Sequence, residues 1–243
     1  MASDPFKQAL ARNPVFCALD TPDLDAALGL ARKLRGAVGG LKLGLEFFSA
    51  QGPQGVAALK ALDLPIFLDL KLHDIPNTVA GALRALNGLG VAMVNVHASG
   101  GPAMMKAAAE TTAQAGANRP RVLAVTVLTS LDGKDLAMMG IAESAATHVV
   151  HLARLAKGAG LDGVVCSAQE IAAVREACGP DFLIVVPGLR PVGSATGDQK
   201  RMATPEGARA AGADVLVVGR PITEAPDPAA AARAIAKSVS PAT

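Results

Sequence analysis

Residues 65–78, PIFLDLKLHDIPNT, place four ionisable side chains directly after an apolar run. Because side chains alternate between the two faces of a strand, Asp69, Lys71 and His73 are predicted to share one face. The leucines at 68, 70 and 72 then share the opposite face. The pattern predicts a buried strand that ends in a charged cluster backed by a packed apolar layer. An ordinary strand end with one solvated salt bridge is the simpler alternative.

Apolar stretches of similar length recur along the whole chain, and helical stretches separate them. Besides the strand in 65–78, strands are predicted at 14–20, 40–45, 91–97, 121–128, 162–167, 182–187 and 214–219. Helices are predicted at 21–35, 47–61, 78–89, 102–115, 144–159, 168–177, 204–211 and 228–237, the first of them capped by Thr21 and Pro22. Eight such units in this length predict an α/β chain that forms a single (β/α)₈ TIM barrel domain over residues 1–243.

An open doubly wound sheet is the alternative fold. That fold usually carries a Gly-rich phosphate loop after its first strand. Here the first strand ends in Asp20-Thr21-Pro22, and no G-x-G-x-x-G or Walker sequence occurs in the chain. The barrel is therefore the favoured prediction.

The composition narrows the class of protein. The chain has 243 residues, of which 51% are hydrophobic, but it has no Trp or Tyr and only six Phe, so the predicted core is aliphatic. A formal net charge of +2, with few aromatic residues for base stacking, argues against nucleic acid as a partner. No apolar run approaches the ~20 residues of a membrane span. The start, MASDPFKQAL, does not resemble a signal peptide.

The cysteines and two of the histidines are weak candidates for chemistry. Cys17, Cys166 and Cys178 lack metal-binding spacing, and we expect buried, reduced thiols in a cytoplasmic protein. His148 and His151 are spaced to share a metal ion, but no third ligand lies nearby in the sequence, so surface or packing roles are favoured. His97, at a strand end, is predicted to support the rim by hydrogen bonding, and a catalytic role is the alternative.

Polar residues gather where the predicted strands end. They are Asp20, Lys42, Asp69, Lys71, Asp74, Asn95, His97, Thr129, Ser130, Gly188, Arg190, Gly219 and Arg220. Barrel enzymes carry their active sites at this end of the strands. Two lysines and three aspartates on one rim predict an alternating charge network.

The loops after the last two strands predict a phosphate site. Arg190 and Arg220 each lie close to a glycine, Gly188 or Gly219, which lets a ligand approach the backbone. Arginine binds phosphate oxygens in a bidentate manner, and barrels often bind phosphate in these two loops. The long loop at 188–203 is predicted to close over a ligand. Two unrelated surface arginines are the alternative.

The residues 67–79, FLDLKLHDIPNTV, resemble the signature of the orotidine 5′-phosphate decarboxylase family, whose D-x-K-x-x-D pattern falls at Asp69, Lys71 and Asp74. The resemblance extends over the chain in the family's order. It includes LD at 19–20, LKLG at 41–44, VNVHASGG at 94–101, VTVLTS at 125–130, PGLRP at 187–191, DQKR at 198–201 and VGRPI at 218–222.

The resemblance implies a role for each matching residue. Lys42, Asp69, Lys71 and Asp74 would form the catalytic network, and Asp74 would reach into the site of the other subunit of a homodimer. Asp20 would lie near the ribose of the substrate, and Thr78 near its ribose or phosphate. Thr129 and Ser130 would lie at the pyrimidine, and Arg190, Gln199, Gly219 and Arg220 would hold the phosphate.

The implied reaction converts orotidine 5′-phosphate to UMP without a metal or organic cofactor. Asp69, beside the carboxylate of the substrate, would disfavour the ground state. Lys71 would stabilise the developing negative charge and protonate C6. Two rival functions remain open. One is a Mg²⁺-dependent sugar-phosphate decarboxylase or aldolase of the same superfamily. The other is a non-catalytic phosphate-binding barrel that acts as a regulator.

Overall fold

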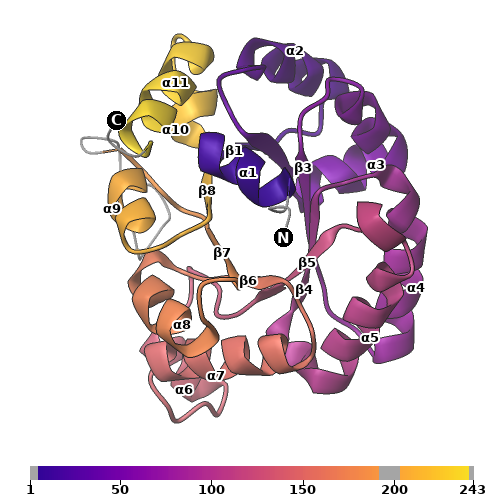
Figure 1. Cartoon of the computed structure of the whole chain (residues 1–243), viewed down its shortest axis with the longest axis vertical. Coiled ribbons are helices and arrows are strands. Elements are labelled where there is room, and N and C mark those ends of the chain that lie inside the picture. Colours follow the sequence, from indigo (N-terminus) through magenta and orange to yellow (C-terminus); the bar gives the residue numbers. More distant parts are fainter. Residues whose placement is uncertain (1–4, 192–202, 241–243) are drawn as a thin grey trace.

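A computed structural model describes residues 5–191 and 203–240. In this part of the chain, eight parallel strands close into a barrel in which β1 pairs with both β2 and β8 (Figure 1). The strands are β1 (Val15–Leu19), β2 (Gly40–Leu43), β3 (Ile66–Leu72), β4 (Met93–His97), β5 (Arg121–Val125), β6 (Gly163–Val165), β7 (Leu183–Val186) and β8 (Val215–Val218). The predicted (β/α)₈ barrel is confirmed, and the open doubly wound sheet is wrong.

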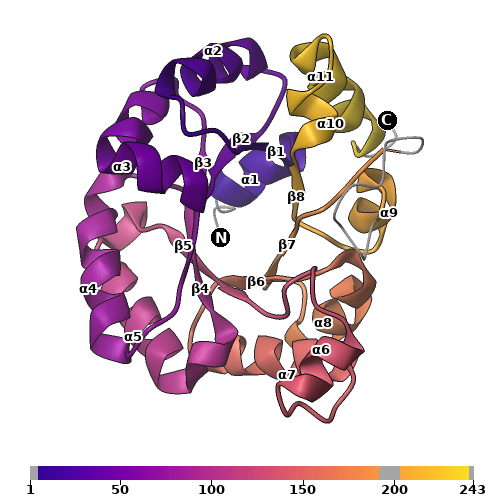
Figure 2. The same ribbon diagram turned by 180° about the vertical axis from the view of Figure 1, so that it is seen from behind.

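Helices surround the barrel (Figures 1 and 2). The helices that correspond to the predicted helical stretches are α2 (Leu24–Leu34), α3 (Leu45–Lys60), α4 (Pro76–Leu86), α5 (Gly101–Ala113), α7 (Ala145–Gly158), α8 (Ile171–Cys178), α9 (Pro205–Ala210) and α11 (Pro228–Ser238). Three further helices of the described residues were not predicted from the sequence, namely α1 (Pro5–Arg12), α6 (Gly133–Met138) and α10 (Arg220–Thr223).

The N-cap predicted for the first helix after β1 was wrong. Asp23 rather than Thr21 caps α2, because its carboxylate accepts hydrogen bonds from the backbone N–H groups of Asp25 and Ala26. The Thr21 hydroxyl instead accepts from the N–H of Asp23 and shapes the turn before the helix. An aspartate also suits the positive end of the helix dipole.

Alternation along the strands divides the core into two layers. Inward side chains such as Phe16, Phe67, Met93 and Leu123 fill the barrel interior. Their outward neighbours pack against the helices in a larger aliphatic layer. Gly40 makes room for this arrangement, since a Cβ there would lie 2.3 Å from the Phe16 ring.

Helix α1 covers the end of the barrel where the strands begin (Figure 1). Phe6 and Leu10, four residues apart and hence on one face of α1, pack against the inner layer. The Arg121 guanidinium lies 5.9 Å from the centroid of the Phe6 ring, and Lys7 pairs with Asp181 before β7. Figure 2 views the barrel from the opposite end, where the strands finish.

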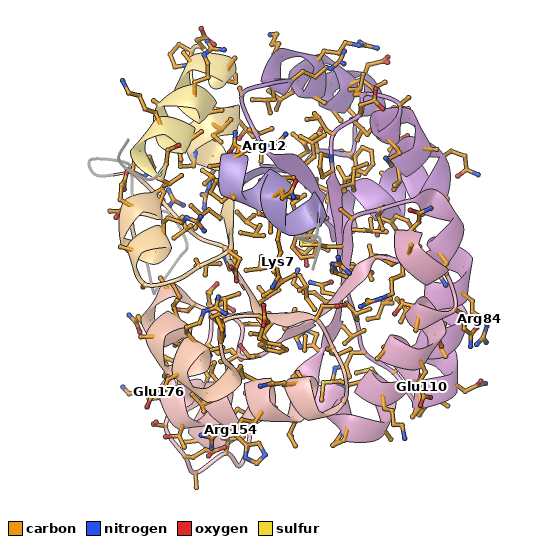
Figure 3. All side chains as sticks on the ribbon, viewed as in Figure 1. Lys7, Arg12, Arg84, Glu110, Arg154 and Glu176 are labelled. Carbon is orange, nitrogen blue, oxygen red and sulfur yellow. The ribbon has the colours of Figure 1, made fainter. Side chains whose placement is uncertain are left out.

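The outer helices carry exposed charged side chains. Arg84, Glu110 and Glu176 extend away from the barrel into solvent (Figure 3). No helix in the described residues has the length and apolar character needed to cross a membrane.

Candidate active site

The end of β3 places Asp69 and Lys71 on the inner side of the barrel, but the strand is not regular there. Leu68 pairs with Val94 and Leu72 with Val96, so β3 contains a bulge opposite β4. Lys71 lies within this bulge at φ 51°, a left-handed conformation that is rare for residues other than glycine. The predicted sharing of one face by Asp69 and Lys71 is confirmed, although the bulge interrupts the simple alternation.

Four charged side chains from three strands form a continuous network. Lys42 Nζ lies 3.0 Å from Asp20 Oδ1 and 3.5 Å from Asp69 Oδ2. Lys71 Nζ lies 2.7 Å from Asp69 Oδ1. Lys42 and Asp69 are each only 8% exposed, so a single solvated salt bridge does not describe this site.

The charges around Asp69 favour its ionised form. Burial alone would raise the pKa of this carboxyl group. The Lys42 and Lys71 ammonium groups, together with hydrogen bonds from Lys71 and Asn95, outweigh burial and lower the pKa below its ordinary value. Asp69 is therefore a carboxylate at neutral pH, held between two cations.

Asn95 is a site residue that the sequence analysis placed at a strand end but did not assign to the site. Its side chain is fully buried on β4, and its Nδ2 donates to Asp69 Oδ1 at 2.7 Å. Its Oδ1 accepts from the backbone N–H of Lys71, also at 2.7 Å. The sequence contained one signal for this role, because Asn95 is a polar residue between two valines of an apolar strand.

Two adjoining cavities open at this end of the barrel, and they share Lys42, Pro187 and Val217. The first, of about 200 Å³, contains Asp69 and Lys71 and is otherwise mainly apolar, with Val125, Val127, Leu128 and Val165 in its wall. The second, of about 250 Å³, is lined by Asp20, Gly188, Arg190, Gly219 and Arg220. An apolar, lysine-bearing cavity beside an arginine-bearing one matches a flat ring attached to an anionic group.

The structure places the remaining predicted residues unevenly. Thr129 lines the first cavity, whereas Ser130 is exposed and is not among its lining residues. Asp74 and Thr78 are exposed near the start of α4, and Asp74 accepts a hydrogen bond from the N–H of Ile75. Gln199 and most of the predicted loop 188–203 lie outside the described residues.

The loops after β7 and β8, which the sequence predicts to bind phosphate, agree with the glycine pattern in part. Gly188 has φ +73°, a conformation that strains other residues. Gly219 has φ −106°, so positive φ does not explain this second glycine. The N–H of Arg190 donates to Ala203 O, which anchors the base of the loop.

The histidines fall into two stacked pairs. His73 and His97 have ring centroids 5.4 Å apart at the rim, close to Lys71. Burial lowers the pKa of His97, as do nearby His73 and Lys71, although Asp69 opposes this effect. His148 instead pairs with Glu143 on the outer surface. Within the described residues, no group of three His, Cys, Asp or Glu side chains is arranged to hold a metal ion.

The cysteines contribute packing. All three thiols are buried, and none is in a disulfide. Burial, with a smaller effect from Asp20, raises the pKa of the Cys17 thiol to about 12. A thiol with such a pKa is a poor nucleophile at neutral pH.

Comparison with known families identifies the chain. The model of the orotidine 5′-phosphate decarboxylase / HUMPS family matches residues 13–235. The chain belongs to this family. The match spans the barrel from just before β1 into α11, and it includes every strand that contributes to the charge network.

Relatives of this chain within the family are named orotidine 5′-phosphate decarboxylase. Orotidine 5′-phosphate decarboxylase from Novosphingobium aromaticivorans is 56% identical over 223 residues, covering 92% of this chain and 97% of the relative. The enzyme of that name from Rhodospirillum rubrum is 54% identical over 235 residues, covering 95% of each chain.

Solved structures extend the likeness to three dimensions. The crystal structure of orotidine 5′-phosphate decarboxylase from Lactobacillus acidophilus aligns with a TM-score of 0.83 and 39% identity, covering 93% of this chain and 99% of the other. The enzyme of that name from Pyrococcus horikoshii aligns with a TM-score of 0.74 and 25% identity, covering 93% and 98%.

Proposed function

We propose that this chain is a carboxy-lyase that converts orotidine 5′-phosphate to UMP in pyrimidine nucleotide synthesis, with Lys71 as the proton donor. The observation that carries the proposal is the ion pair of 2.7 Å between Lys71 Nζ and Asp69 Oδ1 at the wall of the apolar cavity. The names and high identity of the relatives support the same reaction.

The chemistry requires a proton donor beside a forming carbanion. The bond between C6 and the carboxylate breaks, CO₂ leaves, and the electron pair stays on C6. Lys71 is placed to stabilise that charge and to transfer a proton from Nζ to C6, which yields UMP and a neutral amine. That amine regains its proton from solvent before the next turnover. Ammonium groups preorganised in a partly buried site act on such developing charge more strongly than in water.

The role proposed for Asp69 follows from its ionisation. A carboxylate held between Lys42 and Lys71 would face the carboxylate of the bound substrate. Repulsion between the two groups is relieved as CO₂ departs, which lowers the barrier by destabilising the ground state.

Binding of the phosphate supplies energy away from the reacting carbon. Arg190, Arg220 and Asp20 line the second cavity, and Asp20 pairs with Lys42, which lines both cavities. We assign the phosphate to the arginines and Gly219, the ribose to Asp20, and the pyrimidine to Thr129. Gln199 is proposed at the phosphate and Ser130 at the pyrimidine from the family pattern alone. Such remote contacts help to order the site for the reaction.

We also propose a homodimer in which Asp74 and Thr78 of one protomer complete the site of its partner. Both side chains are exposed at the start of α4, where a neighbouring molecule would meet them. Ile75, an apolar side chain that is 66% exposed, lies between them and supports burial at an interface. A cytoplasmic location is proposed as well, which the three buried thiols support.

The magnesium-dependent rival would require a carboxylate available to a cation. Here Asp69 Oδ1 already faces Lys71 and Asn95, and Oδ2 faces Lys42, which favours the lysine-based mechanism. The phosphate-binding regulator would not need this network.

One assay separates the three functions. Loss of orotidine 5′-phosphate is followed by ultraviolet absorbance before and after exhaustive treatment with EDTA. We expect full activity after chelation. Activity that is lost and then restored by Mg²⁺ would favour the sugar-phosphate class, and phosphate binding without turnover would favour the regulator.

A further inference from the structure

Asn95 joins two groups of the charge network that come from β3. Its fully buried amide donates to Asp69 Oδ1 and accepts from the backbone N–H of Lys71, both at 2.7 Å. Only one orientation of the amide fits. The backbone N–H is solely a donor and the carboxylate solely an acceptor, so Oδ1 must face Lys71 and Nδ2 must face Asp69.

The bulge in β3 explains why an amide is needed there. Leu68 pairs with Val94 and Leu72 with Val96, so the three residues of β3 between these pairs lie opposite a single residue of β4, Asn95. Asn95 lies midway between those two valines and supplies from its side chain the acceptor that regular pairing would supply from the backbone. A buried N–H left without a partner would be costly.

The backbone of Lys71 also needs support. A lysine at φ 51° is held in a sparsely populated conformation, and such strain persists where the surroundings impose it. The bulge turns Lys71 so that its Nζ meets Asp69, two residues earlier in the chain. The Asn95 Oδ1 contact is the side-chain hydrogen bond to the Lys71 backbone that holds this turn.

We infer that Asn95 is a positioning residue for the decarboxylation, because its amide fixes both the Lys71 backbone and the Asp69 carboxylate in the geometry that the reaction uses. This inference rests on the proposed function. The amide acts through Asp69 and Lys71 and needs no contact with the substrate.

The competing explanation is that Asn95 only supports the fold. The chain contains a matched example in Asn13, at the opposite end of the barrel. Asn13 Nδ2 donates to Ala37 O at 3.1 Å, and its Oδ1 accepts from the N–H of Val15 at 3.0 Å. This amide also bridges two segments, but it lies far from the charge network. The variant Asn13→Asp is therefore the control for a purely structural defect.

The test compares Asn95→Asp, Asn95→Ala and Asn13→Asp with the wild type. Asn95→Asp keeps the shape and the acceptor for Lys71, but it replaces the donor to Asp69 with a second acidic group. We expect kcat to fall about 10- to 150-fold, the range for loss of one hydrogen bond to a charged group, with little change in KM.

A purely structural role of Asn95 would leave the pH dependence of kcat unchanged, so the pH profile distinguishes the two explanations. Because a second carboxylate disfavours ionisation of the first, the acidic limb of kcat should move to higher pH in Asn95→Asp. Asn95→Ala removes both contacts and should also lower kcat, with the limb moved in the same direction. Asn13→Asp should lower the melting temperature but leave the shape of the profile unchanged.

Each outcome decides between the explanations. Wild-type protein without decarboxylase activity would overturn the proposed function itself. An active wild type with Asn95 variants that keep its kcat and pH profile, or that behave as Asn13→Asp does, would overturn only the positioning role. If circular dichroism finds both Asn95 variants unfolded, Asn95 is a residue of the fold and the inference is wrong.

Discussion

At the scale of single residues, Arg220 tests the phosphate site. Arg220→Ala should weaken binding of the substrate and slow turnover with the fold intact, since this exposed side chain lines the second cavity. A charge-assisted phosphate contact contributes roughly 1.5–3 kcal/mol, or about 10- to 150-fold in kcat/KM. The comparison measures kcat/KM for the nucleotide and for the nucleoside without phosphate.

The two substrates give the Arg220 experiment its control. The deficit should shrink greatly for the nucleoside, because the lost contact is made only to phosphate. Arg12→Ala, an exposed arginine on α1 at the other end of the barrel, should match the wild type with both substrates. Equal deficits with both substrates in Arg220→Ala would refute the phosphate assignment.

His97 gives a second prediction at this scale, on stability. Its pKa is lowered in the folded protein, chiefly by burial. As pH falls below about 6.5, the unfolded chain binds a proton at this histidine before the folded chain does, so stability decreases. The stability is recovered as pH rises again. His97→Gln should flatten this dependence, measured as the free energy of unfolding in urea between pH 7.5 and about 5.

The control for the His97 experiment is His151→Gln, on the exposed side of α7. An NMR titration of the imidazole signals gives an independent measurement of the same quantity. A pKa for His97 at or above the ordinary value near 6.5 would contradict the prediction.

Residue types and spacing predicted most of the charge network. Strand periodicity brought Asp69 and Lys71 together, and barrel topology brought Lys42 and Asp20 to the same rim. The bulge was not predictable, because a left-handed lysine contradicts local backbone preference and depends on a partner 24 residues away, Asn95. Ser130 was placed by family pattern, and the structure leaves its side chain exposed.

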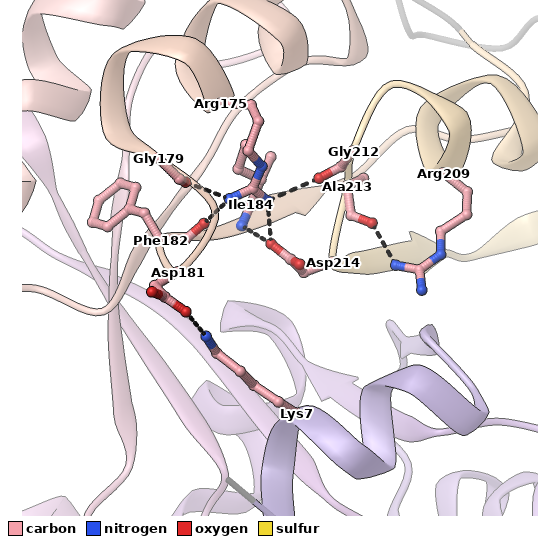
Figure 4. Close-up of polar contacts among 10 residues, drawn as sticks. All are labelled: Lys7, Arg175, Gly179, Asp181, Phe182, Ile184, Arg209, Gly212, Ala213 and Asp214. Atoms are coloured by element: carbon pink, nitrogen blue, oxygen red, sulfur yellow. Dashed lines mark hydrogen bonds and ion pairs between the residues drawn. The ribbon is translucent and has the colours of Figure 1, made fainter. Parts of the chain in front are cut away.

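At the scale of elements, similar polar clamps fix the starts of β6 and β8. Asp162, just before β6, accepts from Arg119 and from the backbone N–H of Val122 on β5. Asp214, just before β8, accepts from Arg175 and from the N–H of Ile184 on β7 (Figure 4). Each carboxylate joins its own strand to the preceding one.

Arg175 extends the second clamp to the end of α8. Its guanidinium also donates to the carbonyls of Gly179, Phe182 and Gly212 (Figure 4). Arg175→Met should therefore lower the free energy of unfolding by about 1.5–3 kcal/mol, the range for hydrogen bonds to charged groups. Since the clamp is distant from the cavities, kcat of the folded variant should not change.

Arg209 provides the matched control for this clamp. Among the described residues, its guanidinium donates to the carbonyl of Ala213 at 2.8 Å (Figure 4). Arg209→Met should therefore cost less stability than Arg175→Met in the same denaturation experiment. Equal losses would mean that the additional contacts of Arg175 contribute nothing beyond the hydrogen bond that Arg209 makes.

The periodic elements were predictable, and among the shortest helices of the described residues α9 was predicted because Thr204 and Pro205 mark its start. The apolar strands and amphipathic helices repeat a pattern that tertiary packing reinforces. Helix α6 has six residues and α10 has four, so neither contains enough sequence for a period to be recognised. The sequence of α1 contains an apolar pair on one helical face, Phe6 and Leu10. The role of this helix depends on the end of the barrel that it covers, which the local sequence does not reveal.

At the scale of the whole molecule, the position of Asp74 bears on the number of chains in one active site. Asp69 is joined to Asp20, Lys42 and Lys71 within a single chain, whereas Asp74 is exposed and accepts from the N–H of Ile75 next to it. A closed two-fold dimer would bring two such segments together reciprocally and give two composite sites.

Complementation tests this arrangement. Inactive Lys71→Ala protein is mixed with inactive Asp74→Ala protein under conditions of subunit exchange, and the heterodimer fraction is measured by native mass spectrometry. If the sites are shared, a heterodimer has one site with both lesions and one with neither. Random exchange makes about half of the dimers heterodimers, so about a quarter of the wild-type activity should return.

The control mixture pairs Lys71→Ala with Asp69→Ala. These two residues form an ion pair within one chain, so each site of the heterodimer still carries one lesion and activity should stay absent. Recovery in the first mixture and not in the second therefore assigns Asp74 to the partner. If mass spectrometry finds heterodimers in the first mixture and no activity returns, Asp74 serves its own protomer or neither site, and the shared active site is wrong.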